Sequence, residues 1–459
     1  MASALLTIWN PEDPAFWQAQ GRSVATRNLW ISIPALFLSF AVWMVWSIVV
    51  VRLPEVGFTY STDQLFWLAS LPGLSGATLR IFYAFMVPIF GGRIWTVVST
   101  ASLLVPAIGI GFAVQDPTTS YGTMLALALL CGLGGGNFAS SMANISFFFP
   151  KEQKGTALGL NAGLGNLGVS AMQFVVPLVV TTSVFGALGG PPQPVLKAGG
   201  GHLWLQNVGF VWVPLILVST AAAWLGMNDL ATARASFREQ AVIFRRSHNW
   251  LMCWLYVGTF GSFIGYSAGL PLLVKSQFPG VDPIRYAFLG PLVGALARPV
   301  GGWLADKLGG ARVTVWNFVA MAAAASAVLL FLPHGGEGGA FGGFLAAFLV
   351  LFATSGIGNG STFRMIPVIF ATLHERRARE AGAGLEAARR EAGKEAAAVI
   401  GFSSAVAAYG AFFIPRAFGI SLKATGSPAA AILGFVAVYL SCIAVTWWWY
   451  ARRRASMPC

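Results

Sequence analysis

The chain has 459 residues, of which 56% are hydrophobic and only 10% are charged. Its mean hydropathy of +0.70 lies far outside the range of soluble globular domains. This composition excludes an ordinary soluble protein and predicts an integral membrane protein in a lipid bilayer. The formal net charge of +13 requires no nucleic acid, because the cytoplasmic loops of membrane proteins are rich in lysine and arginine.

Uncharged segments recur along the whole chain. No residue between Arg27 and Arg52 is charged, and a helix needs roughly 20 residues to cross the hydrocarbon core. A transmembrane barrel would instead show alternating segments of about ten residues. The sequence therefore predicts twelve transmembrane helices, at roughly 30–52, 64–90, 94–114, 121–149, 156–184, 206–226, 249–274, 284–305, 313–333, 340–371, 397–420 and 428–450.

The distribution of charge predicts the orientation and the division of the chain. Most of the 29 lysines and arginines fall in cytoplasmic segments when both termini are placed inside the cell, as the positive-inside rule requires. A charged stretch at 227–248 follows six predicted helices and precedes six more. We expect it to be a cytoplasmic linker between one six-helix bundle at 1–226 and another at 249–459.

The two halves contain a duplicated motif. GATLRIFYAFMVPIFGG starts at Gly76, and GALARPVGGWLADKLGG starts at Gly294. Each copy has an arginine four residues after its first glycine, at Arg80 and Arg298, and the offset between the copies is 218 residues. GGGN at 134–137 and GIGN at 356–359 form a second matching pair. Internal duplication in a chain of this kind predicts a secondary transporter with its substrate site near the bilayer midplane, between the halves.

The duplicated arginines indicate an anionic ligand. After Asp63 the next acidic residue is Asp116, so the sequence around Arg80 offers no carboxylate, and we place all 16 acidic residues in loops or at helix ends. Burial of one cationic side chain at mid-membrane costs at least about 2.5–3.5 kcal/mol, and arginine keeps its charge. An anion is the simplest missing partner for Arg80 and Arg298.

A single intramembrane arginine has another explanation. Its long side chain can extend to the membrane interface or bond to helix carbonyls. This explanation weakens when two arginines occupy equivalent positions of a repeat. We expect it to hold for Arg364 and Arg416, which lie nearer to the ends of their predicted helices.

Three further segments resemble known families. GWLADKLGG at 302–310 resembles the loop motif of the major facilitator superfamily. GGGNFASSMANISFFFPKEQKGTALGLNAGLGNLGVS at 134–170 is similar to the first signature of the nitrate/nitrite porters, and AAAVIGFSSAVAAYGAFFIP at 396–415 resembles the second. The resemblance covers nearly the whole chain. It implies the all-α integral membrane fold of the major facilitator superfamily, with twelve transmembrane helices in two six-helix bundles.

The same resemblance implies a substrate-binding site for nitrate and nitrite. Arginines of helices two and eight clamp the anion in that family, polar contacts come from an asparagine and a tyrosine, and two phenylalanines flank the flat ligand. The matching residues here are Arg80, Arg298, Asn166, Tyr256, Phe138 and Phe260. A guanidinium group offers a planar fork of donors that suits a planar oxyanion. Ala411 departs from the family pattern, where many members have a glycine.

The mode of transport follows from what the predicted helices lack. Proton-driven carriers commonly use intramembrane Asp, Glu or His as relays, and we place none in the predicted helices. Two fixed positive charges should also hinder the empty carrier from changing its conformation. We therefore expect exchange, with nitrate entering and nitrite leaving, by alternating access. Proton-coupled nitrate symport is the main alternative; an anion channel, or a sensor built on the charged segment 373–396, are others.

The sequence offers little for catalysis. It shows no nucleophile paired with a base, no metal cluster and no cofactor-binding loop, so we expect no enzymatic activity and no cofactor. We expect a monomer that spans the inner (plasma) membrane of a bacterial cell.

Overall fold

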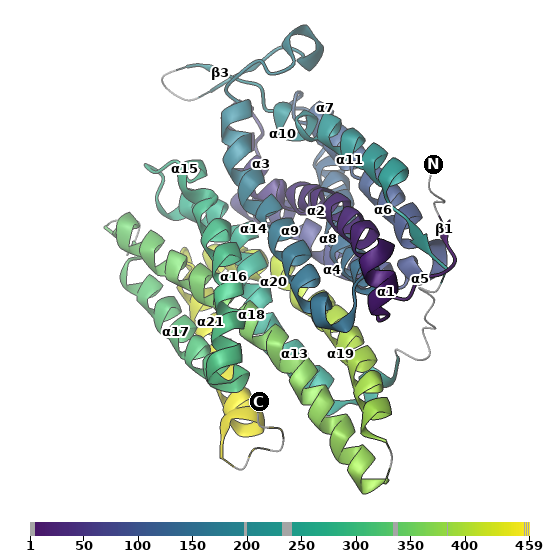
Figure 1. Ribbon diagram of the computed structural model, residues 1–459. Coiled ribbons are helices and arrows are strands. Elements are labelled where there is room, and N and C mark those ends of the chain that lie inside the picture. Colours follow the sequence, from purple (N-terminus) through teal and green to yellow (C-terminus); the bar gives the residue numbers. More distant parts are fainter. Residues whose placement is uncertain are drawn as a thin grey trace. The chain divides into compact units, whose positions relative to one another are not determined.

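The structure, a computed structural model, describes residues 5–196, 200–231, 241–333, 338–382, 384–453, 455, 457 and 459 (Figure 1). Its regular structure is almost entirely helical. Strand β1 (Leu5–Leu6) pairs in parallel with β4 (Asp229–Leu230), and β2 (Gln193–Pro194) pairs antiparallel with β3 (His202–Leu203). The all-α expectation therefore holds for the described residues.

Helices follow one another along both halves of the chain. In the first half they are α1 (Pro14–Phe16), η1 (Trp17–Gly21), α2 (Arg22–Met44), α3 (Trp46–Arg52), η2 (Leu53–Val56), α4 (Thr62–Tyr83), α5 (Met86–Phe90), α6 (Gly92–Ala101), α7 (Leu104–Ala113), α8 (Tyr121–Phe148), α9 (Lys151–Val179), η3 (Gly186–Gly189), α10 (Asn207–Phe210) and α11 (Trp212–Gly226). In the second half they are η4 (Ala241–Arg245), α13 (Ser247–Tyr256), η5 (Val257–Gly261), α14 (Ser262–Gln277), α15 (Ile284–Ala287), α16 (Leu289–Leu308), α17 (Gly310–Leu330), α18 (Phe341–Glu380), α19 (Leu385–Ala408), α20 (Gly410–Thr425), α21 (Ala429–Thr446) and η6 (Trp447–Ala451).

These helices join into 12 spans within the described residues that are long and apolar enough to cross a membrane. The predicted number is therefore confirmed, although some boundaries differ. Helix α18 continues to Glu380, and α19 begins at Leu385, so most of the charged segment 373–396 is helical. Its alanine, arginine and glutamate residues are strong helix formers, whereas hydropathy marks only the part of a helix that suits the membrane interior.

The chain packs into two compact units. Unit 1 comprises Met1–Arg234, Ser267–Leu289 and Ala411–Gly419, and unit 2 comprises Ala235–Tyr266, Gly290–Gly410 and Ile420–Cys459. Unit 1 thus includes two segments from the second half of the sequence. The middle of the predicted linker, residues 232–240, lies outside the described residues. The division into bundles at 1–226 and 249–459 stays a prediction.

Glycines bring helix backbones together at equivalent places in the two units. In unit 1, a Cβ atom added to Gly135 of α8 would lie 2.7 Å from the Cα atom of Gly76 on α4. In unit 2, a Cβ atom added to Gly356 of α18 would lie 2.1 Å from the carbonyl oxygen of Gly294 on α16. Real side chains do not tolerate such distances, so both repeats depend on glycine for close helix packing.

A carboxylate from the segment after α11 caps helix α6. Gly91 precedes this helix with a φ of +92°, a conformation that favours glycine. The Oδ1 atom of Asp229 accepts a hydrogen bond from the backbone N–H of Arg93 at 2.8 Å. A negative charge at this end of a helix satisfies an unpaired N–H group and interacts favourably with the helix dipole. Burial raises the pKa of the Asp229 carboxyl group above its ordinary value, and the bond from Arg93 opposes that shift.

We predict that Asp229→Ala lowers the stability of the protein by about 1 kcal/mol, because the first turn of α6 loses its cap. Asp229→Asn should lower the stability by less, since an amide oxygen still accepts a hydrogen bond. Thermal unfolding in detergent measures both effects. Glu391→Ala is the matched control, because Glu391 is 60% exposed in its ion pair with Lys394 and exposed pairs contribute little. Equal melting temperatures for Asp229→Ala and the control would contradict the capping role.

Candidate anion-binding site

Arg80 lies on α4 in unit 1 and is completely buried. Its Nε atom donates a hydrogen bond to the carbonyl oxygen of Gly135 on α8 at 2.9 Å. Its guanidinium carbon lies 4.9 Å from the ring centroid of Phe138 and 5.1 Å from that of Trp43. The arginine is therefore held by a neutral carbonyl group and by aromatic faces that attract cations. The structure thus places Arg80 and Phe138 together, as the sequence predicts.

Trp43, on α2, is a neighbour of Arg80 that the sequence reasoning missed. Its indole Nε1 donates a hydrogen bond to the carbonyl oxygen of Pro72 on α4 at 2.7 Å. This bond orients the ring toward the helix that carries Arg80. Tryptophan is the best aromatic partner for a cation, but nothing in the sequence separates this residue from the other 16 tryptophans.

Asn166 lies on α9, also in unit 1, and is 1% exposed. Its Oδ1 atom has no hydrogen-bond partner among the residues that the structure describes. A buried amide oxygen without a hydrogen bond lowers the stability of the folded protein by roughly 1–3 kcal/mol, unless another group bonds to it. Asn166 therefore carries unused hydrogen-bonding capacity in the same unit as Arg80.

Arg298, on α16 in unit 2, bonds to Tyr256, which in turn stacks on Phe260. Its Nη2 atom donates to the hydroxyl oxygen of Tyr256 at 3.3 Å. The Tyr256 and Phe260 rings stack with centroids 5.4 Å apart and an interplanar angle of 10°. Arg298 is 8% exposed, and its Nη1 atom has no hydrogen-bond partner within the described part of the chain. The planar set of N–H donors on the Arg298 guanidinium group therefore has unused hydrogen-bonding capacity.

A local π-helix shapes this part of unit 2. Phe260 lies within η5 (Val257–Gly261), directly after Tyr256 at the end of α13. Single π turns inside α-helices are rare and are frequent at functional sites. Phe363 is a contact that the sequence reasoning missed, with its ring centroid 5.0 Å from the Arg298 guanidinium carbon. A signal did exist, because an aromatic residue follows the asparagine of both GGGN and GIGN within about one helical turn.

Two other arginines of the predicted helices form ion pairs. Arg416 donates to Asp63 at 2.8 Å and lies 4.1 Å from the ring centroid of Trp67, all within unit 1. Arg364 forms an ion pair with Asp306 within unit 2. The expectation that both side chains extend to the membrane interface stays a prediction, and the structure adds that both have carboxylate partners. These partners lie 353 and 58 residues away in sequence, which is why local sequence could not predict the pairs.

One buried carboxylate in unit 2 corrects the expectation that acidic residues lie only in loops or at helix ends, because Glu395 lies in the middle of α19. Glu395 is 6% exposed and bonds to Arg246 at 2.5 Å and to His374 at 2.7 Å. His374 lies within α18 instead of in the expected loop. The cluster therefore ties the segment before α13 to the last third of α18 and to the middle of α19.

Comparison with known proteins agrees with this architecture. Residues 35–389 match the family profile described as Major Facilitator Superfamily. A crystal structure of a bacterial homologue of the human lysosomal transporter Spinster superposes with a TM-score of 0.60 at 16% sequence identity, covering 91% of this chain and 93% of that one. At this identity the likeness shows the fold alone, and the expected fold is confirmed.

Two relatives are much more similar in sequence. The chain is 53% identical over 454 residues to the "Nitrate/nitrite transporter NarU" of Escherichia coli (strain K12), covering 98% of this chain and 97% of the relative. It is 44% identical over 461 residues to the "Probable nitrate/nitrite antiporter NarK2" of Thermus thermophilus, covering 99% and 98%. The chain therefore belongs to the nitrate/nitrite porter family of the Major Facilitator Superfamily, as its two signature segments indicated.

Proposed function

We propose that this protein is a secondary transporter that exchanges nitrate for nitrite across the inner membrane of a bacterial cell. Nitrate enters and nitrite leaves by alternating access, and both termini lie in the cytoplasm. Arg80 and Arg298 both bind the transported anion. Asn166 and Tyr256 supply further hydrogen bonds, while Phe138 and Phe260 restrict the ligand to flat anions.

The observation that carries this proposal is the state of the two arginines. Each is buried and lies against groups that attract a cation: a carbonyl group and aromatic rings at Arg80, a phenol and a ring at Arg298. Neither residue can lose its charge, because the guanidinium group stays protonated in proteins. A planar monoanion matches the geometry of the donor fork, and at Arg298 it would bond to the Nη1 atom, which has no hydrogen-bond partner among the described residues.

Similarity supports the choice of anion. The two relatives described above are named as a nitrate/nitrite transporter and as a probable nitrate/nitrite antiporter, and they match nearly the whole chain. At 53% and 44% identity over this length, we assign the same substrates to this protein.

The ion pairs of the buried carboxylates favour exchange over proton coupling. Glu395 is bonded to an arginine and a histidine, and Glu55, which is 5% exposed, is bonded to Arg52 and Lys275. A carboxylate held by two basic groups resists protonation, so neither residue is suited to release and take up protons during transport. The fixed charges of the arginines oppose conformational change of the empty carrier, and a bound anion removes that barrier.

One set of ion pairs in unit 1 would close the outer end of the transport path. We call Arg52, Glu55, Lys275 and Asp282 the outer charge cluster. Arg52 bonds to Glu55 at 2.6 Å and to Asp282 at 3.1 Å, and Lys275 bonds to Glu55 at 2.7 Å. Lys275 and Asp282 come from the second half of the chain and nevertheless pack in unit 1. In the proposed transport cycle these bonds break when the outer end opens.

We predict that Arg80→Lys and Arg298→Lys each reduce nitrate exchange by about 10- to 100-fold. Lysine keeps the charge and loses the planar fork, so at least one charged hydrogen bond worth about 1.5–3 kcal/mol is lost. Counterflow into proteoliposomes measures the effect, with membrane insertion checked by quantifying the purified protein. Arg389→Lys, at an arginine that is 67% exposed, is the control. Wild-type exchange in both site variants would refute their role.

We predict that nitrate enters proteoliposomes rapidly only when nitrite or nitrate is present inside. The voltage is clamped, and each condition is repeated with and without a pH gradient. We expect the rate of nitrate uptake to be the same with and without the pH gradient, because no proton moves in an exchange of two monoanions. Uptake into anion-free vesicles driven by an inward proton gradient would establish symport instead, and flux that is not stimulated by an anion on the opposite side would establish a channel.

We predict that Lys275→Gln loosens the outer end of the protein. Gln173 is a suitable reporter position, because it is buried and its Nε2 atom donates to the carbonyl oxygen of Ser267 at 2.9 Å within unit 1. In a protein with Gln173→Cys and its native cysteines replaced by alanine, an impermeant maleimide added outside should react severalfold faster when Lys275→Gln is present. Lys394→Gln on the same background is the control, and equal labelling rates would contradict the proposed closure.

A further inference from the structure

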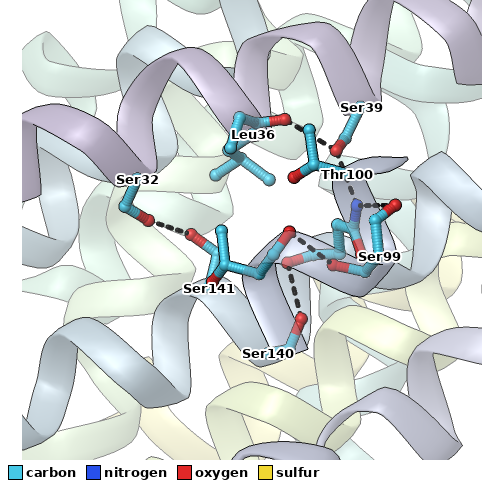
Figure 2. Close-up of a pocket in the computed structure, with 10 residues that line it drawn as sticks. Ser32, Leu36, Ser39, Ser99, Thr100, Ser140 and Ser141 are labelled. Carbon is cyan, nitrogen blue, oxygen red and sulfur yellow. Dashed lines mark hydrogen bonds between the residues drawn. The ribbon is translucent and has the colours of Figure 1, made fainter. Parts of the chain in front are cut away.

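A small polar pocket lies within unit 1 among α2, α6 and α8 (Figure 2). Serine and threonine hydroxyl groups form most of its wall, with Ser32 and Ser141 at one end and Ser39 and Ser99 at the other. Its volume of about 10 Å³ is close to the space that one water molecule occupies. The proposed anion site does not include any of these lining residues.

Two buried polar atoms of this pocket are unsatisfied. Asn137 is 5% exposed and Thr100 is 1% exposed. The Oδ1 atom of Asn137 and the Oγ1 atom of Thr100 have no hydrogen-bond partner in the described ranges of the chain. Leaving such an atom unbonded costs roughly 1–3 kcal/mol. A ligand that donates to an amide oxygen and also bonds to a hydroxyl group would satisfy both atoms.

The chemistry of the wall selects water as that ligand. Every side chain that lines the pocket is uncharged. A monovalent cation would find oxygen ligands but no counter-charge there, and the positive charge of Arg80 on the adjoining helix would repel it. Water can donate to Asn137 and either donate to or accept from Thr100, and buried waters typically make two to four such bonds.

The pocket adjoins the wall that holds Arg80. Asn137 lies between Gly135, whose carbonyl oxygen accepts from Arg80, and Phe138, whose ring faces the guanidinium group. Its Nδ2 atom donates to Ser39 on α2 at 2.7 Å. Ser39 precedes Trp43 by about one helical turn. Asn137 thus links the segments of α8 and α2 that contact the arginine.

We propose that this pocket binds one ordered water molecule, and that Asn137 with its water positions the segments of α2 and α8 that orient Arg80. Asn137 is a positioning residue, because it acts on the anion through Arg80. The effect on transport rests on the proposed function, whereas the water site itself does not.

The first test locates the water. A high-resolution structure of the wild-type protein in a lipid phase should show a peak within hydrogen-bond distance of Asn137 Oδ1 and Thr100 Oγ1, and Thr100→Val should remove it. Thr220→Val is the matched control, because Thr220 also has a buried hydroxyl oxygen without a hydrogen-bond partner among the residues that the structure describes and does not line this pocket. An empty pocket in the wild-type protein would overturn the proposal. A melting temperature raised by sodium chloride relative to choline chloride would identify a cation site and overturn it equally.

The second test addresses positioning. Asn137→Leu should raise the KM for nitrate about tenfold, the equivalent of about one hydrogen bond, while the maximal rate stays within about twofold. Asn137→Gln keeps both the amide donor and the amide acceptor without adding a charge, and it should recover part of the loss. An unchanged KM in Asn137→Leu would refute the positioning role. If the wild-type protein does not exchange nitrate, the proposed function fails, and the water peak still decides whether the pocket is a water site.

Discussion

The burial of two permanently charged guanidinium groups among apolar helices is the constraint on which the rest of this structure depends. Arginine cannot escape the membrane interior by losing its proton, so its surroundings must stabilise the charge. At Arg80 a backbone carbonyl and two aromatic rings do so, and at Arg298 a phenol and a phenylalanine ring. Neutral groups such as these stabilise a guanidinium cation through carbonyl dipoles and aromatic faces.

Close helix packing makes this stabilisation possible. The carbonyl group of Gly135 can accept from Arg80 because α4 and α8 approach each other at glycines. Close packing of two helices at glycines recurs in unit 2, where Gly294 of α16 meets Gly356 of α18. Small residues in membrane helices are usually explained by packing alone. At Gly135 the packing also brings a backbone carbonyl group within hydrogen-bond distance of the Arg80 guanidinium group.

Several other charged side chains form ion pairs. The outer charge cluster, the Arg416–Asp63 pair and the bonds of Glu395 all match cations with carboxylates. Such pairs tie helices and the segments between them together, and they can break and re-form when a path opens. Arg80 and Arg298 lie against a carbonyl group, a phenol and aromatic rings, so a second kind of interaction stabilises charge in the interior of the helices.

Local information in the sequence determined the twelve helices, since the length of an apolar segment is enough to predict a membrane span. The duplication pointed to Arg80 and Arg298, and the signature segments identified the family. Only the tertiary structure decided which groups surround the arginines, that Arg364 and Arg416 are paired with carboxylates, and that the segment Ala411–Gly419 packs in unit 1. These contacts join residues far apart in sequence, so they depend on how helices pack against one another, which hydropathy and spacing along one chain do not encode.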